Sequence, residues 1–422
     1  MPSPRRFYIC TLCFLGLLVA TCDRVNIAVA APSIMRERGW NTGQMGLALS
    51  AFYAGYVAFM VPSGIWTDRF GPKRSFAWGV SWWSTFTALT PVASALTGLC
   101  TVRALMGAGE SATIPSIGAM LARWFAPREY SRASALAWSG GYAGSVLAFP
   151  VASVILSGWG WRAIFYVFAG LGLLWLVLWW RIASDGVDSG STSENVEIGG
   201  TASTGSPIQP PRTIPWKQIL SSPAAWAIFL LHFSSNWFTY FLMSWLPTYL
   251  RLSRHFSITN MAIGSALPFT CALVGTNVWG TCIDWLSVNH DRTRVNKFFL
   301  LLFFGAAIIL ISLHWVSSPL GVVFLLCLAA LLMTGATPVF ASGALDLMPN
   351  SAGTFAGMQN TVANLSGVLA PAMTGYLAAK IGWAAAFAAT ASACCLGIVA
   401  YAIMGSATPI VARNAGNEPG RD

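Results

Sequence analysis

The sequence predicts an all-α integral membrane protein with twelve transmembrane helices in two six-helix pseudo-repeats, and three observations support this fold class. First, the 422 residues are 55% hydrophobic and only 9% charged, whereas about 25% of a soluble domain is charged. Second, the apolar stretches are about 20 residues long, which is the length of a helix that crosses a bilayer. Third, they show no alternation with a period of two, so they do not predict the strands of a membrane barrel.

Twelve stretches fit this description, and they divide evenly along the chain. The first half contains residues 7–31, 43–65, 75–96, 98–123, 131–156 and 160–181. The second half contains residues 223–250, 259–283, 296–316, 318–345, 352–379 and 382–406. The first stretch follows two arginines and imitates a signal peptide, but Asp23 and Arg24 interrupt it, so we interpret it as a transmembrane helix.

A polar segment separates the two sets of stretches. Residues 182–216 are rich in Gly, Ser and Thr, and such a segment cannot bury enough apolar area to fold. We therefore expect an N-terminal six-helix bundle at 1–181, a flexible cytoplasmic linker at 182–216, a C-terminal six-helix bundle at 217–406 and a cytoplasmic tail at 407–422. A Gly-x-x-x-Asp run closes both the second and the eighth stretch, which indicates an internal duplication.

The distribution of lysine and arginine predicts the orientation in the membrane. An even number of spans places both termini on one side, and sixteen Lys and Arg residues fall there. Cytoplasmic loops collect positive charge, so we expect both termini in the cytoplasm. The short loops and termini favour the inner membrane of a bacterial cell, and we expect a multi-pass monomer in that lipid bilayer. Six basic residues are expected on the opposite, outer side: Arg36, Arg38, Arg162, Arg251, Arg254 and Lys380.

The composition also argues against several classes of function. A net charge of +10 would suggest a nucleic acid partner in a soluble protein, but here the loops account for it, so we expect none. All nine cysteines lie in apolar stretches and form no CxxC…CxxC pattern or Cys/His cluster, so we expect no metal, no cofactor and no disulfide framework. The sequence shows no pairing of a nucleophile with a base, and we do not expect an enzyme.

Four charged side chains lie inside predicted helices, where a charge costs at least about 2.5–3.5 kcal/mol and so marks a candidate functional site. Asp23 and Arg24 lie in the first span, and Arg103 and Glu110 lie in the fourth. The helical rise places Arg24 about 10 Å and Arg103 about 7–8 Å from the outer ends of their spans, with Glu110 near the midplane. The two arginines are therefore expected at similar depth.

This set of charges suits the transport of a carboxylate together with protons. The planar guanidinium of arginine binds a carboxylate with two hydrogen bonds. A carboxyl group buried away from water holds its proton more tightly, so Asp23 and Glu110 could each bind a proton on one side and release it on the other. The alternative is that the four residues form fixed ion pairs that hold the first half together. An ion pair that breaks on protonation would satisfy both interpretations.

The helices of the second half carry neutral polar side chains in place of charges. Side chains of this kind most often make hydrogen bonds between helices. We interpret His232 as a packed interior residue, and Asp346, at the cytoplasmic end of the tenth span, as a helix-end or gate residue. The neutral polar residues are Asn236, Tyr240, Ser244, Asn277, Asn360 and Asn364.

The loop after the second stretch carries a motif. Its sequence, Gly64-Ile-Trp-Thr-Asp68-Arg69-Phe-Gly71-Pro-Lys73-Arg74, resembles the cytoplasmic signature loop of the major facilitator superfamily, G-x-x-x-D-R-x-G-x-[KR]-[KR]. These charges also fit a simple excess of positive charge on the cytoplasmic side. The resemblance implies more, because in this superfamily the Asp and the basic residues pair with the opposite half and stabilise the outward-open state. The expected gating loop comprises Gly64, Asp68, Arg69, Gly71 and Arg74, in which the glycines permit close approach and the turn.

Further motifs narrow the resemblance to the anion:cation symporter branch of the superfamily, and they extend over nearly the whole chain. The resemblance implies that Arg24, Tyr56, Arg103 and Asn364 bind substrate. It also implies that Asp23 and Glu110 take up protons. The motifs are Asp23-Arg24-Val-Asn26-Ile-Ala-Val-Ala, Arg103-Ala-Leu-Met-Gly107-Ala-Gly109-Glu110-Ser-Ala-Thr-Ile-Pro115, Trp124-Phe-Ala-Pro127-Arg-Glu129, Trp245-Leu-Pro-Thr-Tyr-Leu250 and Asn360-Thr-Val-Ala-Asn364-Leu-Ser-Gly367-Val-Leu-Ala-Pro371.

We therefore expect a secondary active transporter that imports a small organic anion, a carboxylate such as a sugar acid, by proton symport with alternating access. One departure concerns the sugar: Gly140-Gly141 stands in the fifth span, where relatives place a glutamine, so a more apolar or aromatic acid stays open. The alternatives are a sodium-coupled or exchange carrier of another carboxylate, and a membrane sensor that does not transport.

Overall fold

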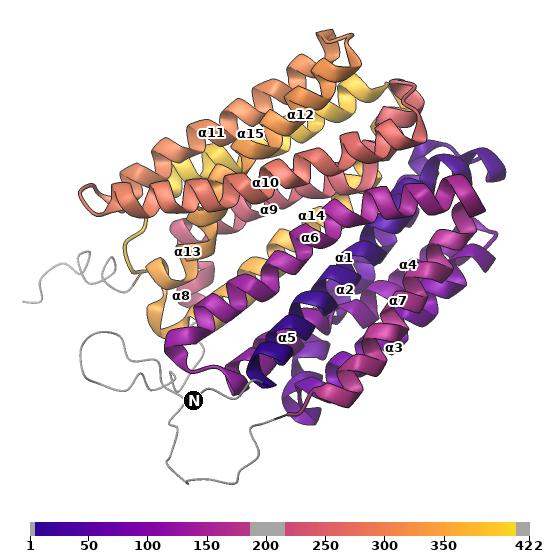
Figure 1. Cartoon of the computed structure of the whole chain (residues 1–422). Helices are drawn as coiled ribbons and strands as arrows, with labels where there is room; N and C mark the ends of the chain where they lie inside the picture. The colour runs from indigo at the N-terminus through magenta and orange to yellow at the C-terminus, as the bar shows by residue number, and fades with distance from the viewer. Residues whose placement is uncertain (1–4, 186–215, 411–422) are drawn as a thin grey trace, which may run out of the picture. The chain divides into compact units, whose positions relative to one another are not determined.

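The computed structural model describes residues 5–185 and 216–410, and every regular element within them is a helix (Figure 1). The predicted linker and tail lie outside the described residues where they cover 186–215 and 411–422. The helices are α1 (Arg5–Arg38), α2 (Thr42–Phe70), α3 (Pro72–Leu89), α4 (Leu96–Glu110), α5 (Thr113–Trp124), α6 (Pro127–Trp159), α7 (Trp161–Ile182), α8 (Trp216–Leu220), α9 (Pro223–Thr248), α10 (Ile258–Ser287), α11 (Arg292–Ser312), α12 (Pro319–Met333), α13 (Thr337–Leu347), α14 (Ala352–Lys380) and α15 (Trp383–Met404).

The twelve-helix membrane fold predicted from the sequence is confirmed. Nine helices of the described residues are long and apolar enough to cross a membrane, by length and composition. Helix α3, the α4–α5 pair and α9 supply the other three expected spans. Several helices extend beyond their apolar stretches because polar residues cap them. At the start of α2, for example, the Asn41 side chain accepts from the Gln44 N–H at 2.9 Å, and the Gln44 side chain accepts from the Asn41 N–H at 3.0 Å.

The fourth span is broken in its middle, which the apolar pattern over 98–123 did not predict. Helix α4 ends at Glu110 and α5 begins at Thr113. Pro115 has no N–H to offer the carbonyl of Ser111 four residues earlier. The Ser63 hydroxyl donates to that carbonyl at 3.1 Å instead. The proton-carrier candidate Glu110 therefore lies directly at a break in its helix.

The tenth span is broken in the same way. Helix α12 ends at Met333, the turn η4 covers Thr334–Ala336, and α13 follows at once. Pro338 stands four residues after Thr334, as Pro115 stands four residues after Ser111, so it also removes a helical hydrogen bond. Interrupted helices at corresponding positions of two halves indicate the binding region in transporters built from repeats.

Contacts between residues divide the chain into two compact units. In their described parts, the first comprises Met1–Glu194, Phe241–Thr270 and Gly367–Ala386, and the second comprises Asn195–Tyr240, Cys271–Ser366 and Phe387–Asp422. The first unit therefore includes segments of α9, α10, α14 and α15 from the second half of the sequence. The six-helix bundles at 1–181 and 217–406 stay a prediction, because the boundaries of these two units differ from the predicted boundaries of the bundles.

Within the first unit, α1 packs against α6 and α7, and α2 packs against α4 (Figure 1). The start of α2 also contacts the end of α14. The Thr42 hydroxyl donates to the Gly375 carbonyl at 2.9 Å, and the Ala372 N–H donates to the Ser50 hydroxyl at 2.9 Å. A Cβ atom at Gly46 would lie 2.7 Å from the Pro371 carbonyl oxygen, so a glycine is needed for this approach.

Candidate functional site

Two glycines bring α2 and α4 into close contact and so position one wall of the site. A Cβ atom at Gly107 of α4 would lie 2.0 Å from the Phe52 carbonyl oxygen. A Cβ atom at Gly55 of α2 would lie 1.9 Å from the Ala104 carbonyl oxygen. Because both obstacles are backbone atoms, the helices could not approach so closely with larger residues there. The approach leaves the Phe52 ring centroid 4.9 Å from the Arg103 guanidinium carbon.

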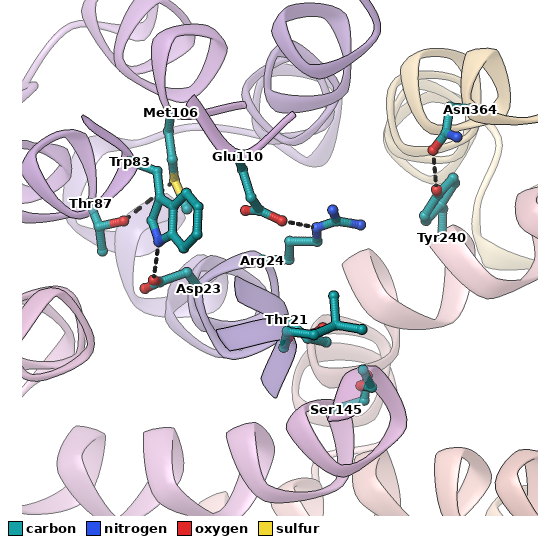
Figure 2. A network of polar contacts seen from close by, with 12 residues as sticks. Thr21, Asp23, Arg24, Trp83, Thr87, Met106, Glu110, Ser145, Tyr240 and Asn364 are labelled. Atoms are coloured by element: carbon teal, nitrogen blue, oxygen red, sulfur yellow. Dashed lines mark hydrogen bonds and ion pairs between the residues drawn. The ribbon is translucent and has the colours of Figure 1, made fainter. Parts of the chain in front are cut away.

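Arg24 of α1 and Glu110 of α4 form a direct ion pair, drawn in Figure 2. The Arg24 Nε donates a hydrogen bond to Glu110 Oε1. The Glu110 side chain is fully buried, and the Arg24 side chain is 15% exposed. The Arg24 guanidinium carbon lies 4.8 Å from the Tyr56 ring centroid and 5.5 Å from the Phe52 ring centroid. The structure thus brings three predicted site residues together: Arg24, Tyr56 and Glu110.

Arg103 is a buried cation without a carboxylate partner in the described residues. It is 2% exposed, and no described carboxylate forms an ion pair with it at 4.0 Å or less. Its Nη1 donates to the Met106 sulfur at 3.1 Å, which is a weak acceptor. Its Nε is buried and has no hydrogen-bond partner in the part of the chain that the structure describes. Since a buried donor without an acceptor is costly, this guanidinium is suited to hydrogen-bond an anion.

Asp23 is fully buried, and neutral donors hold it. The Trp83 Nε1 of α3 donates to Asp23 Oδ2 at 3.1 Å, as Figure 2 shows. The Asn26 Nδ2, one turn along α1, donates to Asp23 Oδ1 at 3.4 Å. Among the described residues no arginine forms an ion pair with Asp23. The alternative of fixed ion pairs therefore describes Arg24 and Glu110 but not Asp23 and Arg103.

The second oxygen of Glu110 has a different environment from the first. Glu110 Oε2 is buried and has no hydrogen-bond partner among residues 5–185 and 216–410, whereas Oε1 accepts from Arg24. A buried carboxylate oxygen without a donor is an expensive arrangement in its charged form, and protonation would remove that charge. Glu110 thus carries one oxygen suited to an ion pair and one suited to a proton.

The predicted substrate residue Asn364 lies in the second unit. The Tyr240 hydroxyl donates to Asn364 Oδ1 at 2.7 Å, a bond also drawn in Figure 2, and the Asn364 Nδ2 donates to the Asn360 carbonyl at 2.8 Å. Asn364 is 7% exposed. Its oxygen therefore belongs to an interhelical hydrogen bond between α14 and α9, which is the common role of such residues.

Two other second-half residues have the environments that the sequence suggested. His232 lies in the interior, where its ring stacks on Phe340 with centroids 4.1 Å apart and its Nδ1 lies 3.1 Å from the Gln359 Nε2. Asp346, near the end of α13, accepts from the Arg292 Nε at 3.2 Å and so connects α13 to α11. His232 is thus a packed interior residue, and Asp346 connects the end of α13 to the start of α11.

The gating loop has a well-defined turn. Gly71 joins α2 to α3 with a φ of +83°, a conformation that favours glycine. The Lys73 N–H donates to Asp185 Oδ1 at 2.8 Å, and the Trp179 Nε1 donates to the Lys73 carbonyl at 3.0 Å. Asp185 also lies 3.8 Å from the Arg123 Nη1. The sequence placed Asp185 in the linker, but the structure makes it an anchor of this loop.

The charged members of the gating loop are exposed at the surface of the protein. Asp68, Arg69 and Arg74 are exposed. A Cβ atom at Gly64 would meet no atom of the described residues within 4 Å, so the close approach expected at Gly64 is not made there. The gating role of this loop stays a prediction.

Sequence reasoning missed three residues of the site: Phe52, Trp83 and Met106. The Phe52 ring lies within 5.5 Å of both guanidinium carbons, Trp83 holds Asp23, and Met106 contacts Arg103. Trp83 is one of twenty tryptophans, and nothing in its neighbourhood along the chain marks it. Met106 lies one turn from Arg103 on the same helix, which is a signal that the spacing could have provided.

Comparison with known proteins shows the family of this chain. The family model described as "Major Facilitator Superfamily" matches residues 13–371. The chain is 36% identical over 393 residues to the "Ascorbate transporter, chloroplastic" of Arabidopsis thaliana, which covers 90% of this chain and 71% of that protein. It is 34% identical over 417 residues to the "Sodium-dependent phosphate transport protein 1, chloroplastic" of the same plant, covering 97% and 80%.

Solved structures show the same fold. A bacterial homolog of the human lysosomal transporter Spinster, in an inward-facing and occupied conformation, matches with a TM-score of 0.78 and 17% sequence identity. The match covers 96% of this chain and 97% of that one. At this identity the likeness concerns the fold of the chain alone.

Proposed function

We propose that this chain, which belongs to the Major Facilitator Superfamily, is a secondary active transporter that imports a small organic anion by proton symport with alternating access. The favoured substrate is a carboxylate, and a sugar acid is the favoured class. Two similar proteins are named for the transport of ascorbate and of phosphate. Both of those substrates are anions, which supports the sign of the charge that we propose.

The observation that carries the proposal is the buried Arg103. Its guanidinium is 2% exposed and has an unused Nε donor among the described residues. A buried donor without an acceptor is costly. A substrate carboxylate would supply the missing acceptor and could accept two parallel hydrogen bonds from the planar guanidinium. Arg103 is therefore proposed as the main residue that binds the substrate carboxylate.

The charges of the site explain why a proton and an anion would bind together. Asp23, Arg24, Arg103 and Glu110 sum to zero when both carboxyl groups are ionised. Adding one proton leaves a net charge of +1 in a buried region, and a monovalent anion returns it to zero. Each ligand thus lowers the electrostatic cost of binding the other. That mutual dependence is the thermodynamic requirement for symport.

Glu110 is the proposed carrier of the coupling proton. Protonation would remove the charge that attracts Arg24 and so weaken their ion pair. The Arg24 guanidinium could then turn part of its donor fork toward the substrate carboxylate. When the proton leaves, the ion pair forms again and competes with the substrate. Asp23, held by Trp83 and Asn26, is the second proposed proton site.

The remaining assignments complete the proposal. Tyr56 lies against Arg24 and would contact the substrate from α2. Asn364, with Tyr240, would supply polar contacts from the second half of the chain. Asp68, Arg69 and Arg74 of the loop around Gly71, with Gly64, are proposed to act in gating. For this multi-pass membrane protein we propose the inner membrane of a bacterial cell, a monomeric state and cytoplasmic termini.

Uptake into proteoliposomes tests the proposal. Purified protein is given an inward proton gradient and a panel of radiolabelled anions: a hexonate, a hexuronate, a dicarboxylate, an aromatic carboxylate and inorganic phosphate. We expect accumulation of one carboxylate that depends on the gradient and is lost in Arg103→Lys protein. Accumulation that is unchanged by this substitution would contradict the proposed substrate site.

A second candidate is a sodium-coupled carrier. The 34% identical relative is named as sodium-dependent, and it is named for phosphate. The same vesicles, tested with an inward sodium gradient at equal pH on both sides, separate the two mechanisms. Accumulation of phosphate or a carboxylate under sodium alone would favour the second candidate.

A further inference from the structure

A cavity lies at the C-terminal end of α1 in the first unit, and neither Arg24, Arg103 nor Glu110 lines it. It has a volume of about 530 Å³, which is the size of a small-molecule pocket. The end of α1, the α6–α7 turn and the start of α10 surround it. Most of its lining is apolar, and its basic members are Arg36 and Arg251. Apolar lining residues include Val29, Pro32, Leu156, Trp161, Ile258 and Met261.

The charges of this cavity are not neutralised by its one acidic residue. Glu37 lines the cavity, but both of its oxygens are engaged: Oε2 accepts from the Trp161 Nε1 at 2.8 Å, and both oxygens accept from Arg162. Arg162 thus compensates Glu37 outside the cavity. Within residues 5–185 and 216–410, Arg36 makes no hydrogen bond and no ion pair. Two positive charges are therefore left for a ligand.

Arg251 is held in position by an unusual backbone. It lies in the π-helical turn η2 (Tyr249–Ser253), which follows α9, and π-helical turns are frequent at functional sites. His255, just beyond the turn, has a φ of +56°, a conformation that is uncommon for a residue other than glycine. The chain turns back here, so that the Arg251 Nη1 donates to the Phe256 carbonyl at 2.6 Å. This bond fixes one edge of the guanidinium and leaves its other donors for a ligand.

We propose that this cavity is a second anion-binding site, separate from Arg103, which takes an oxyanion with an apolar portion. Arg36 and Arg251 would bind the phosphate or carboxylate head group, since guanidinium groups bind such oxyanions with paired hydrogen bonds. The apolar lining would contact the rest of the ligand. The head group could belong to a soluble organic anion or to an acidic phospholipid, because both present the same chemistry to the arginines.

The site has a role in the proposed transport if the predicted orientation holds. Arg36 and Arg251 belong to the six basic residues expected on the outer side, where Glu37 is the one acidic residue. A positive surface raises the local concentration of anions and speeds their association. The cavity would then collect an anion at the entrance before it reaches Arg103. This role rests on the proposed function, whereas binding in the cavity does not.

Equilibrium binding of radiolabelled phenyl phosphate tests the site. The full chain is placed in nanodiscs of phosphatidylcholine, which carries no net charge, and four proteins are compared: wild type, R36Q/R251Q, K380Q and R103K. Lys380 is exposed and does not line the cavity, so K380Q is the matched loss of one positive charge on the same predicted side. Arg36 is exposed and Arg251 is partly exposed, so their replacement leaves the packed interior intact.

We expect wild type, K380Q and R103K to bind phenyl phosphate saturably, and R36Q/R251Q to bind at least about tenfold more weakly. Equal binding by wild type and R36Q/R251Q, or no saturable binding by wild type, would overturn the proposal. Loss of uptake in R103K with retained phenyl phosphate binding would separate this site from the transport site. A variant that changes uptake but not phenyl phosphate binding therefore bears on the proposed function and not on the cavity.

A second arm identifies the source of the anion. The same binding is measured in nanodiscs that also contain phosphatidylglycerol. If the lipid head group occupies the cavity, wild type binds phenyl phosphate about tenfold more weakly there, while R36Q/R251Q does not change between the two lipids. If binding by wild type is the same in both lipids, the site takes a soluble anion. Both outcomes support the site and differ only in its occupant.

Discussion

Arg24 of α1 and Glu110 of α4, 86 residues apart in the sequence, are joined by a partly buried ion pair at the point where the fourth span breaks. The break exists because Pro115 cannot donate to the Ser111 carbonyl, which Ser63 satisfies instead. A carboxylate at a helix break has one oxygen in the ion pair and one without a donor in the described residues. This arrangement connects protonation of Glu110 to the availability of Arg24.

The first prediction concerns Glu110→Gln. Glutamine has the shape of a protonated glutamate and cannot lose the proton, so the carrier would be unable to release it. We expect uphill accumulation under an inward proton gradient to fall to the equilibrium level, while exchange of labelled for unlabelled substrate continues. Glu129→Gln is the matched control, because it removes a half-exposed carboxylate that pairs with Arg6. Full uphill accumulation by Glu110→Gln would remove this residue from the coupling role.

The second prediction concerns Arg103→Lys. Lysine keeps the positive charge but lacks the planar pair of N–H donors that forms two parallel hydrogen bonds with a carboxylate. We expect the Kd of the transported anion to rise at least about tenfold, which corresponds to about 1.4 kcal/mol. The measurement is equilibrium binding to purified protein, with Arg123→Lys, a half-exposed arginine, as the control. An unchanged Kd would show that the substrate carboxylate binds elsewhere.

The third prediction concerns Trp83→Phe. Phenylalanine keeps one aromatic ring but removes the N–H that donates to Asp23. Because a buried acceptor loses a partner, we expect the free energy of unfolding to fall by about 1–3 kcal/mol. Trp78→Phe, in the same helix but exposed, should change it by less than about 0.5 kcal/mol. Denaturation in detergent compares the two, and an equal effect would mean that the Asp23 bond contributes nothing.

The fourth prediction compares two adjacent glycines. A Cβ atom at Gly140 of α6 would lie 2.2 Å from the Phe14 carbonyl oxygen of α1, whereas the nearest atom to a Cβ at Gly141 is 3.7 Å away. We expect Gly140→Ala to destabilise the protein by at least about 1–3 kcal/mol through overpacking. Gly141→Ala should be neutral or stabilising by up to about 1 kcal/mol.

Thermal unfolding of the two alanine variants provides the measurement. If Gly140→Ala were as stable as Gly141→Ala, α1 and α6 could not approach as closely as the structure indicates. Gly141 is the one of the two positions where an added Cβ atom would make only ordinary van der Waals contacts.

The fifth prediction concerns the gating loop. Asp68 is exposed and lies three residues before Gly71, whose left-handed conformation makes the turn. We expect Asp68→Asn to lower the maximal rate of uptake several-fold while the Kd of the substrate stays the same, because a gate affects conformational exchange and not the site. Rates and equilibrium binding on the same preparation separate the two effects. A change confined to Kd would argue against a gating role.

The sequence predicted the twelve spans because each is a long apolar stretch, and length together with apolar composition decides whether a helix can cross the bilayer. It also singled out Asp23, Arg24, Arg103 and Glu110, since a charge within such a stretch stands out without any knowledge of packing. Three of these residues, Arg24, Arg103 and Glu110, lie close to the rings of Phe52 or Tyr56 or to each other.

Other features depend on contacts between helices and could not be found in the same way. Trp83 is the partner of Asp23 because α3 packs against the part of α1 that carries Asp23. The polar neighbours of Asp185 predict a place in the linker, although its side chain accepts a hydrogen bond from the Lys73 N–H. The break after Glu110 did have a local signal in Pro115, but hydropathy averages over a proline and does not register a missing N–H.

The measurement that tests the central account most directly is the movement of protons during anion entry. Proteoliposomes containing a trapped pH indicator are given the transported carboxylate at equal external and internal pH, with no sodium present. We predict that the interior acidifies as the anion enters in wild type, and that acidification is absent in Glu110→Gln while exchange continues. Anion entry without acidification, or entry that requires sodium, would contradict proton symport through Glu110.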